Sequence, residues 1–205
     1  MSAINKIISM LFMAGWLGLV AMPMEARSEA TASELKAAAE IDRAREYFTN
    51  LPLINQDGET VQFFDDVLKD KVVVVNFIFT NCDGACPLMT HKLSLVRDRM
   101  EGQIGDTVEF VSLSIDPERD TPAAMKEFAR SHHADHDGWT FLTGKPENLD
   151  YIIKRLGQYS DDVEAHSTMM LAGNVNAAHW IKIQPYEQPP AITEKLQGLL
   201  RDNEI

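Results

Sequence analysis

The chain has 205 residues, and its 45% hydrophobic and 24% charged content is typical of one globular domain with extensions. Nineteen Lys and Arg stand against 31 Asp and Glu, which gives a formal net charge of -12 and argues against nucleic-acid binding, because phosphate contacts need a basic face. The two cysteines are too few for a scaffold that depends on several disulfides.

The N-terminus has the pattern of an export signal. Lys6 precedes a stretch without charges over residues 7–24, and small residues follow. We expect residues 1–30 to be a signal peptide or an N-terminal membrane anchor, because the length of the stretch leaves both alternatives open. Either one places the folded part in the periplasm or at the outer face of the bacterial inner membrane, and an anchor would also attach it to that membrane.

The remaining chain divides into a peripheral helix and linker over residues 31–50 and one domain over residues 51–205. Alanine-rich spacing predicts the helix over 33–48, with Ser33 as its N-cap. The turn sequence Asn55-Gln56-Asp57-Gly58 predicts a small hairpin between residues 53–54 and 60–63.

Strands and helices then alternate along the domain. Strands are expected over 72–79, 108–115 and 139–142, and helices over 88–100, 122–131 (capped by Thr121) and 147–156. A strand pair over 167–171 and 180–183, joined by a turn at Gly173-Asn174, and a helix over 192–200 complete the chain. This order predicts an α/β fold, a thioredoxin-like sandwich with a central sheet, an N-terminal hairpin and a peripheral N-terminal helix.

The only two cysteines follow a buried strand directly, in the stretch VVVVNFIFTNCDGACP. Cys82 and Cys86 therefore lie at a helix start, where backbone amides and the helix dipole favour the thiolate. Their C-x-x-x-C spacing is one residue longer than the C-x-x-C of redox thioredoxins and also suits a bridging metal ion. A structural disulfide is the less favoured alternative, although an exported pair can oxidise and would then need reduction before it bound a metal.

Two further residues are candidates by position. In thioredoxin-like redox proteins a cis-proline faces the cysteines, but this chain has no proline between Pro146 and Pro185, and His166 occupies that place. Asp116 follows a buried strand at the edge where sites in such sheets form, so it either caps a turn or supports the site from outside the metal shell.

Other clusters favour ordinary structural roles. The stretch His132-His133-Ala134-Asp135-His136-Asp137 could bind a surface metal ion, but a solvated loop is the favoured interpretation. His91 is expected at the surface of the helix after the cysteines. Of Met169 and Met170, one is expected to face the core by strand alternation.

The motifs FIFTNCDGACP and VSLSIDPERDTPAAMKEFA, followed by His166, resemble the Sco/SenC family of thioredoxin-like, copper-binding assembly proteins of cytochrome c oxidase, over residues 51–200. The resemblance implies that Cys82, Cys86 and His166 bind one copper ion, as Cu(I) or Cu(II), with Asp116 in a neighbouring loop. The chain departs from the family pattern at Asp83, where proline is usual, and in the hairpin turn over 172–176. The implied copper ligands are kept in spite of both departures, and what the departures affect is the expected identity of the client protein.

These observations lead to two hypotheses of function. The first is a copper metallochaperone, not an enzyme, which delivers copper to an exported cuproprotein such as cytochrome c oxidase subunit II. The alternative is a thiol-disulfide oxidoreductase that keeps the client's copper-binding cysteines reduced, with Cys82 as nucleophile, Cys86 as resolving residue and a thiol reductant as second partner. A thiol peroxidase ranks last, because no supporting proline and arginine can be identified around Cys82.

Overall fold

The computed structural model of the chain describes residues 24–202, so most of the expected signal or anchor segment lies outside the described residues. Helix α1 runs from Met24 to Phe48. The prediction of an N-cap at Ser33 is wrong, because the helix begins before it; the preceding Ala and Glu residues are good helix formers and let it extend. Among the described helices, none is both long and apolar enough to cross a bilayer.

Two compact units make up the chain, and the second, Lys36–Ile205, contains one mixed sheet of seven strands in the order β2-β1-β5-β4-β3-β6-β7. Strands β3, β4 and β5 are parallel, and the other pairs are antiparallel. The strands are β1 (Pro52–Asn55), β2 (Thr60–Gln62), β3 (Val72–Ile78), β4 (Val108–Ser114), β5 (Trp139–Thr143), β6 (Met170–Asn174) and β7 (His179–Ile183). This arrangement confirms the predicted α/β class and the N-terminal hairpin.

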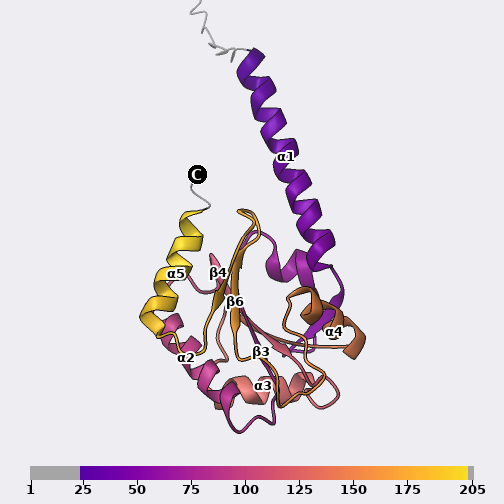
Figure 1. The fold of residues 1–205 in the computed structure, drawn as a ribbon, viewed down its shortest axis with the longest axis vertical. Helices are drawn as coiled ribbons and strands as arrows, with labels where there is room; N and C mark the ends of the chain where they lie inside the picture. The colour runs from indigo at the N-terminus through magenta and orange to yellow at the C-terminus, as the bar shows by residue number, and fades with distance from the viewer. Residues whose placement is uncertain (1–23, 203–205) are drawn as a thin grey trace, which may run out of the picture. The chain divides into compact units, whose positions relative to one another are not determined.

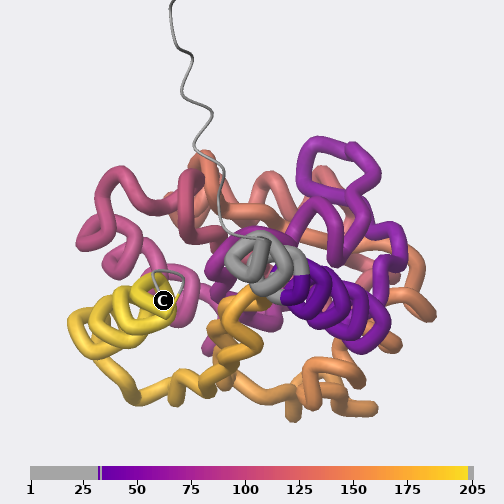
Figure 2. Tube along the Cα trace, turned by 90° about the horizontal axis from the view of Figure 1, so that it is seen from above, coloured from indigo at the N-terminus to yellow at the C-terminus, as the bar shows by residue number. Residues whose placement is uncertain are grey.

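Helices cover both faces of the sheet, as Figures 1 and 2 show, with α2 and α5 on one side and α4 on the other. The helices are η1 (Phe63–Leu68, a π-helix), α2 (Ala85–Arg99), α3 (Pro122–Ser131), α4 (Pro146–Arg155) and α5 (Pro189–Arg201). All seven residues of β3 are buried, because a parallel strand between two helical layers has no solvent-facing side. Alternate residues of β3 enter two core clusters, with Val72 and Val74 in one and Val73 and Val75 in the other.

The last hairpin differs from its prediction. Gly173 and Asn174 are strand residues that pair with Trp180 and His179, and the turn follows them, where Ala178 N–H donates to Val175 O at 3.1 Å. A Cβ at position 173 would lie 2.1 Å from the Trp180 ring. Glycine is therefore required here because the indole ring packs directly on the backbone, and not because the chain turns at this residue.

The parallel strands end together at the edge where the cysteine motif begins. Ile115 N–H donates to Ile78 O at 2.9 Å, which extends the β3–β4 pairing one step beyond the strand ends. Past this point one chain segment leads through Cys82 into α2, and the other leads through Asp116 into α3. The fold thus brings the two motifs to one edge of the sheet, the usual location of sites in open α/β sheets.

Candidate metal centre

The two cysteines occupy the entry to α2. Both thiols are free; Cys82 is half-buried in the loop, and Cys86 is a buried residue of the first helical turn. Cys86 N–H donates to Cys82 Sγ at 3.4 Å. The N-cap residue, Gly84, has no side chain to accept a hydrogen bond, so the Cys82 sulfur accepts from a first-turn amide as an N-cap side chain would.

This arrangement makes the two thiols chemically unequal. Burial raises the pKa of Cys82, but hydrogen bonds from the Cys86 thiol and from the backbone of Cys86, Gly84 and Ala85 outweigh burial and lower the pKa below its ordinary value. Burial, the hydrogen bond to Cys82 and the nearby charges of Cys82 and Asp120 raise the pKa of Cys86 to about 12, against a lowering hydrogen bond from the Phe79 backbone. Cys82 therefore forms the thiolate more readily than Cys86 and is the more reactive of the two thiols.

His166 lies next to the cysteine loop, with Phe79 between them. The His166 and Phe79 rings meet edge to face with centroids 5.6 Å apart, and Phe79 O accepts the Cys82 N–H at 3.3 Å. His166 Nδ1 bonds to Val163 O at 2.7 Å. Because a carbonyl can only accept, Nδ1 carries the proton, and Nε2 keeps the lone pair that a metal would need.

His166 and Cys82 both contact Phe79, but the three predicted ligands do not converge on one point. Among residues 24–202, no three His, Cys, Asp or Glu side chains are close enough to hold a metal ion. Local hydrogen bonds shape the segment before His166: Glu164 N–H donates to Asp162 Oδ1 at 2.9 Å, and Ala165 N–H donates to Asp162 O at 3.2 Å. The structure thus places the His166 ring against Phe79, and the three predicted ligands do not form a completed site.

Asp116 makes the contacts of a turn-capping residue. Its backbone N–H donates to Ser114 Oγ at 3.1 Å, and its carboxylate accepts from the exposed Arg119 at 3.1 Å. Its carbonyl accepts the N–H groups of Arg119 and Asp120, which closes the turn. These contacts are those of a residue that caps a turn, one of the two alternatives for Asp116. The other alternative, support of a bound metal ion, stays a prediction.

The sequence prediction missed Asp120, which is only 1% exposed. Asp120 Oδ1 accepts from Thr80 N–H at 2.9 Å and from Thr80 Oγ1 at 2.7 Å, while Oδ2 accepts from Ser114 Oγ at 2.5 Å. Three donors from two elements offset the cost of burying a carboxylate. The only signal in the sequence was the second Asp of DPERD, and the local pattern assigns that residue to the turn before Thr121.

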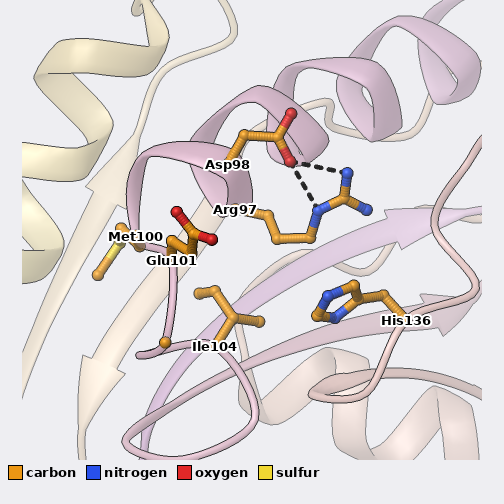
Figure 3. A pocket seen from close by; sticks show the side chains of 7 residues that line it. Arg97, Asp98, Met100, Glu101, Ile104 and His136 are labelled. Carbon is orange, nitrogen blue, oxygen red and sulfur yellow. Dashed lines mark hydrogen bonds and ion pairs between the residues drawn. The ribbon is translucent and has the colours of Figure 1, made fainter.

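The rival histidine cluster does not assemble a metal site. His132 packs on the Phe128 ring with centroids 4.4 Å apart, and the His136 ring nitrogen bonds to Asp137 O. His136 and Arg97 line a hollow of about 430 Å³. Figure 3 shows the His136 ring and, across from it, Arg97 paired with Asp98. His91 is exposed, as expected, and Met170 is the buried member of its pair.

A family model described as SCO1/SenC matches residues 39–201. The chain belongs to the SCO1/SenC family. Among its relatives, the SCO1 protein homolog of Bacillus subtilis (strain 168) is 40% identical over 124 residues, which cover 51% of this chain and 63% of that protein. The chain therefore aligns with less than two thirds of the length of this relative.

Solved structures share the fold and include a copper-bound example. The SCO1/SenC family lipoprotein from Bacillus anthracis str. Ames is 29% identical, with a TM-score of 0.65 over 74% of this chain and 94% of that one. ScoI of Bradyrhizobium japonicum with copper bound is 26% identical, with a TM-score of 0.60 over 72% and 96%. BsSco, described as a member of the Sco family of cytochrome c oxidase assembly proteins and as containing a disulfide switch, is 25% identical, with a TM-score of 0.63 over 74% and 92%. These matches confirm the thioredoxin-like fold.

Proposed function

We propose that this protein binds one copper ion through Cys82, Cys86 and His166 and delivers it to an exported cuproprotein, such as subunit II of cytochrome c oxidase. The observation that carries the proposal is the unequal thiol pair at the start of α2, with an imidazole of fixed tautomer one ring away. Two soft sulfurs and one nitrogen suit Cu(I). The copper-bound relative and the family's link to oxidase assembly support it.

The geometry supports an order of binding. Cys82 is the more exposed sulfur and loses its proton more readily than Cys86, so it meets the ion first. The Cys86 thiol then loses its proton to water as its sulfur–copper bond forms, because a bound cation favours the thiolate. His166 closes the site last, since its segment must move toward the sulfurs before Nε2 can bind. Copper held by few ligands stays open to attack by the client's ligands.

Metal analysis of the reduced protein tests this proposal. We expect one copper per chain, and a loss of affinity of about 10-fold or more in His166→Ala, because a three-coordinate site that loses one ligand keeps only two. His91→Ala is the matched control, since it removes an exposed imidazole from α2 and should leave binding unchanged. Absence of copper from the reduced wild-type protein, or equal affinity in His166→Ala, would overturn the assignment.

The unequal pKa values of the thiols also favour the second candidate function, thiol-disulfide exchange. The Cys82 thiolate would attack a client disulfide, form a mixed disulfide and release one client thiolate. Cys86, after losing its proton, would attack the Cys82 sulfur, release the second client thiolate and close the Cys82–Cys86 disulfide. The client gains the two electrons that this protein loses, and a thiol reductant must restore them. Turnover of a disulfide substrate that persists in His166→Ala would support this role.

Export is part of the proposal. A signal peptide or anchor within residues 1–30 would place the domain of residues 51–205 in the periplasm or at the outer face of the inner membrane, and the B. anthracis relative is a lipoprotein. An N-terminal sequence determination on the protein from the exporting host distinguishes cleavage from an uncleaved anchor. Recovery of the uncleaved protein from the cytosolic fraction would contradict both.

A further inference from the structure

One buried carboxylate beside the cysteine loop has no role in copper ligation as described above. Strand β3 ends at Ile78, and the chain leaves the sheet two residues before Thr80. Thr80 directs both its backbone N–H and its hydroxyl to Asp120 Oδ1, at 2.9 and 2.7 Å. Cys82 follows two residues later, so this double hydrogen bond is a fixed point of the chain immediately before the first sulfur.

Asp120 is itself held on its other side. Its second oxygen accepts from Ser114 Oγ, the hydroxyl at the end of β4, at 2.5 Å. Its backbone N–H donates to Asp116 O at 2.9 Å, and the next residue, Thr121, caps α3 with its hydroxyl. The carboxylate therefore connects the end of β4 and the start of α3, both rigid elements, to the first residues of the cysteine loop.

We propose that Asp120 is a positioning residue, which fixes Thr80 and through it sets the place of Cys82 for metal binding. This proposal rests on the proposed copper function. The loop has few other constraints on this side: Cys82 N–H donates to Phe79 O at 3.3 Å, and the Cys82 sulfur accepts from the Cys86 amide at 3.4 Å. The bond to the Phe79 carbonyl is long for N–H···O, and the bond to sulfur ties Cys82 to α2 rather than to the sheet, so the two short bonds from Thr80 to Asp120 are the main link between this loop and the sheet.

Three variants separate hydrogen bonding from charge. Asp120→Asn keeps an oxygen for both Thr80 donors, and its amide can donate to Ser114, whose hydroxyl is also an acceptor. Asp120→Ala removes all three bonds. Ser112→Ala is the matched control, because it removes buried hydrogen bonds to Asn76 and Trp139 in the same sheet without touching the cysteine loop.

The first readout is Cu(I) affinity of the reduced protein, measured by competition with a chromophoric Cu(I) chelator. We expect Asp120→Ala to weaken binding about 10- to 100-fold, the usual effect of losing a residue that orients a ligand, and Asp120→Asn to restore it to within about threefold. Ser112→Ala should lower the melting temperature and leave affinity unchanged. Equal affinity in Asp120→Ala and wild type overturns the proposal, and so does equal damage by Asn and Ala, which would assign the effect to charge.

The second readout does not need copper. Hydrogen exchange of the Cys86 amide reports its bond to the Cys82 sulfur. We expect faster exchange of this amide in Asp120→Ala, relative to later amides of α2, with protection restored in Asp120→Asn and kept in Ser112→Ala. Unchanged protection in Asp120→Ala overturns the positioning role. If the wild-type protein binds no copper but the exchange pattern is as expected, the proposed copper function fails while the positioning of Cys82 stands.

Discussion

The unequal thiols predict that a small alkylating reagent modifies Cys82 and spares Cys86 in the reduced protein. The physical reason is that the thiolate, not the thiol, reacts. The hydrogen bonds at the start of α2 hold the pKa of Cys82 below 9.0, its ordinary value, whereas burial and the adjacent charges raise the pKa of Cys86 to about 12.

The size of the preference follows from these directions. At about pH 8, a pKa of about 12 leaves roughly one Cys86 in ten thousand as thiolate, whereas a pKa below 9.0 leaves at least about one Cys82 in ten. The more basic thiolate is intrinsically the better nucleophile, and a pKa difference of about three units gives the Cys86 thiolate an intrinsic rate advantage of about 20-fold. Cys82 should therefore react about 50-fold faster, and the burial of Cys86, which is 2% exposed, adds to this ratio.

Timed alkylation with iodoacetamide, followed by peptide mass spectrometry, measures both rates in one sample. The Cys82 rate should rise with pH and reach half of its maximum below pH 9, because its pKa is lowered, while Cys86 should keep gaining reactivity in strong alkali. Cys82→Ala is an informative comparison, since it removes two causes of the raised pKa of Cys86, the hydrogen bond and the charge of Cys82. Equal rates for the two cysteines in the wild-type protein, or faster reaction of Cys86, would refute the reasoning.

Two further predictions concern packing. Gly173→Ala should destabilise the protein by about 1–3 kcal/mol in denaturant unfolding, because its methyl would overlap the indole ring that lies over it. Its control is Gly198→Ala, where the nearest atom is 3.8 Å away and the change should be neutral or stabilising. A larger loss of stability in Gly198→Ala than in Gly173→Ala would contradict this packing. Phe79→Leu should weaken copper binding more than it slows Cys82 alkylation, since the ring contact with His166 is lost while the Phe79 backbone stays. Phe77→Leu is its matched control, because Phe77 of β3 packs in the other core cluster, and it should affect neither; equal copper affinity in the two variants would count against a role for that contact.

Local sequence signals predicted the elements whose causes are local. Thr121 and Pro122 mark the start of α3, and the structure has the helix over the predicted residues, with Ala124 N–H bonded to the Thr121 hydroxyl at 3.2 Å. The apolar run from Val72 is likewise the central strand, because only a strand covered on both faces tolerates such a sequence. Caps and hydrophobic runs act over a few residues, so one sequence suffices to locate them.

Contacts between side chains on different segments account for two further errors. Gly173 has the sequence of a turn, but a ring seven residues later decides its place in a strand. Asp120 has the sequence of a loop residue, but its partner Thr80 is 40 positions earlier in the chain. Neither partner can be inferred from spacing along the chain, because the sheet alone brings these segments together.

The imidazole separates the two candidate functions more clearly than the sulfurs do. Disulfide exchange needs a thiolate and a resolving thiol, which Cys82 and Cys86 provide without any help from His166. The bond from Nδ1 to Val163 O at 2.7 Å fixes one tautomer of His166 and leaves Nε2 as the free donor nitrogen, as in a metal-binding histidine. The contact of the same ring with Phe79 keeps it beside the loop that carries Cys82. A third copper ligand requires this tautomer, and an approach of the His166 segment to the sulfurs would complete the site, so the imidazole gives the metallochaperone role the greater weight.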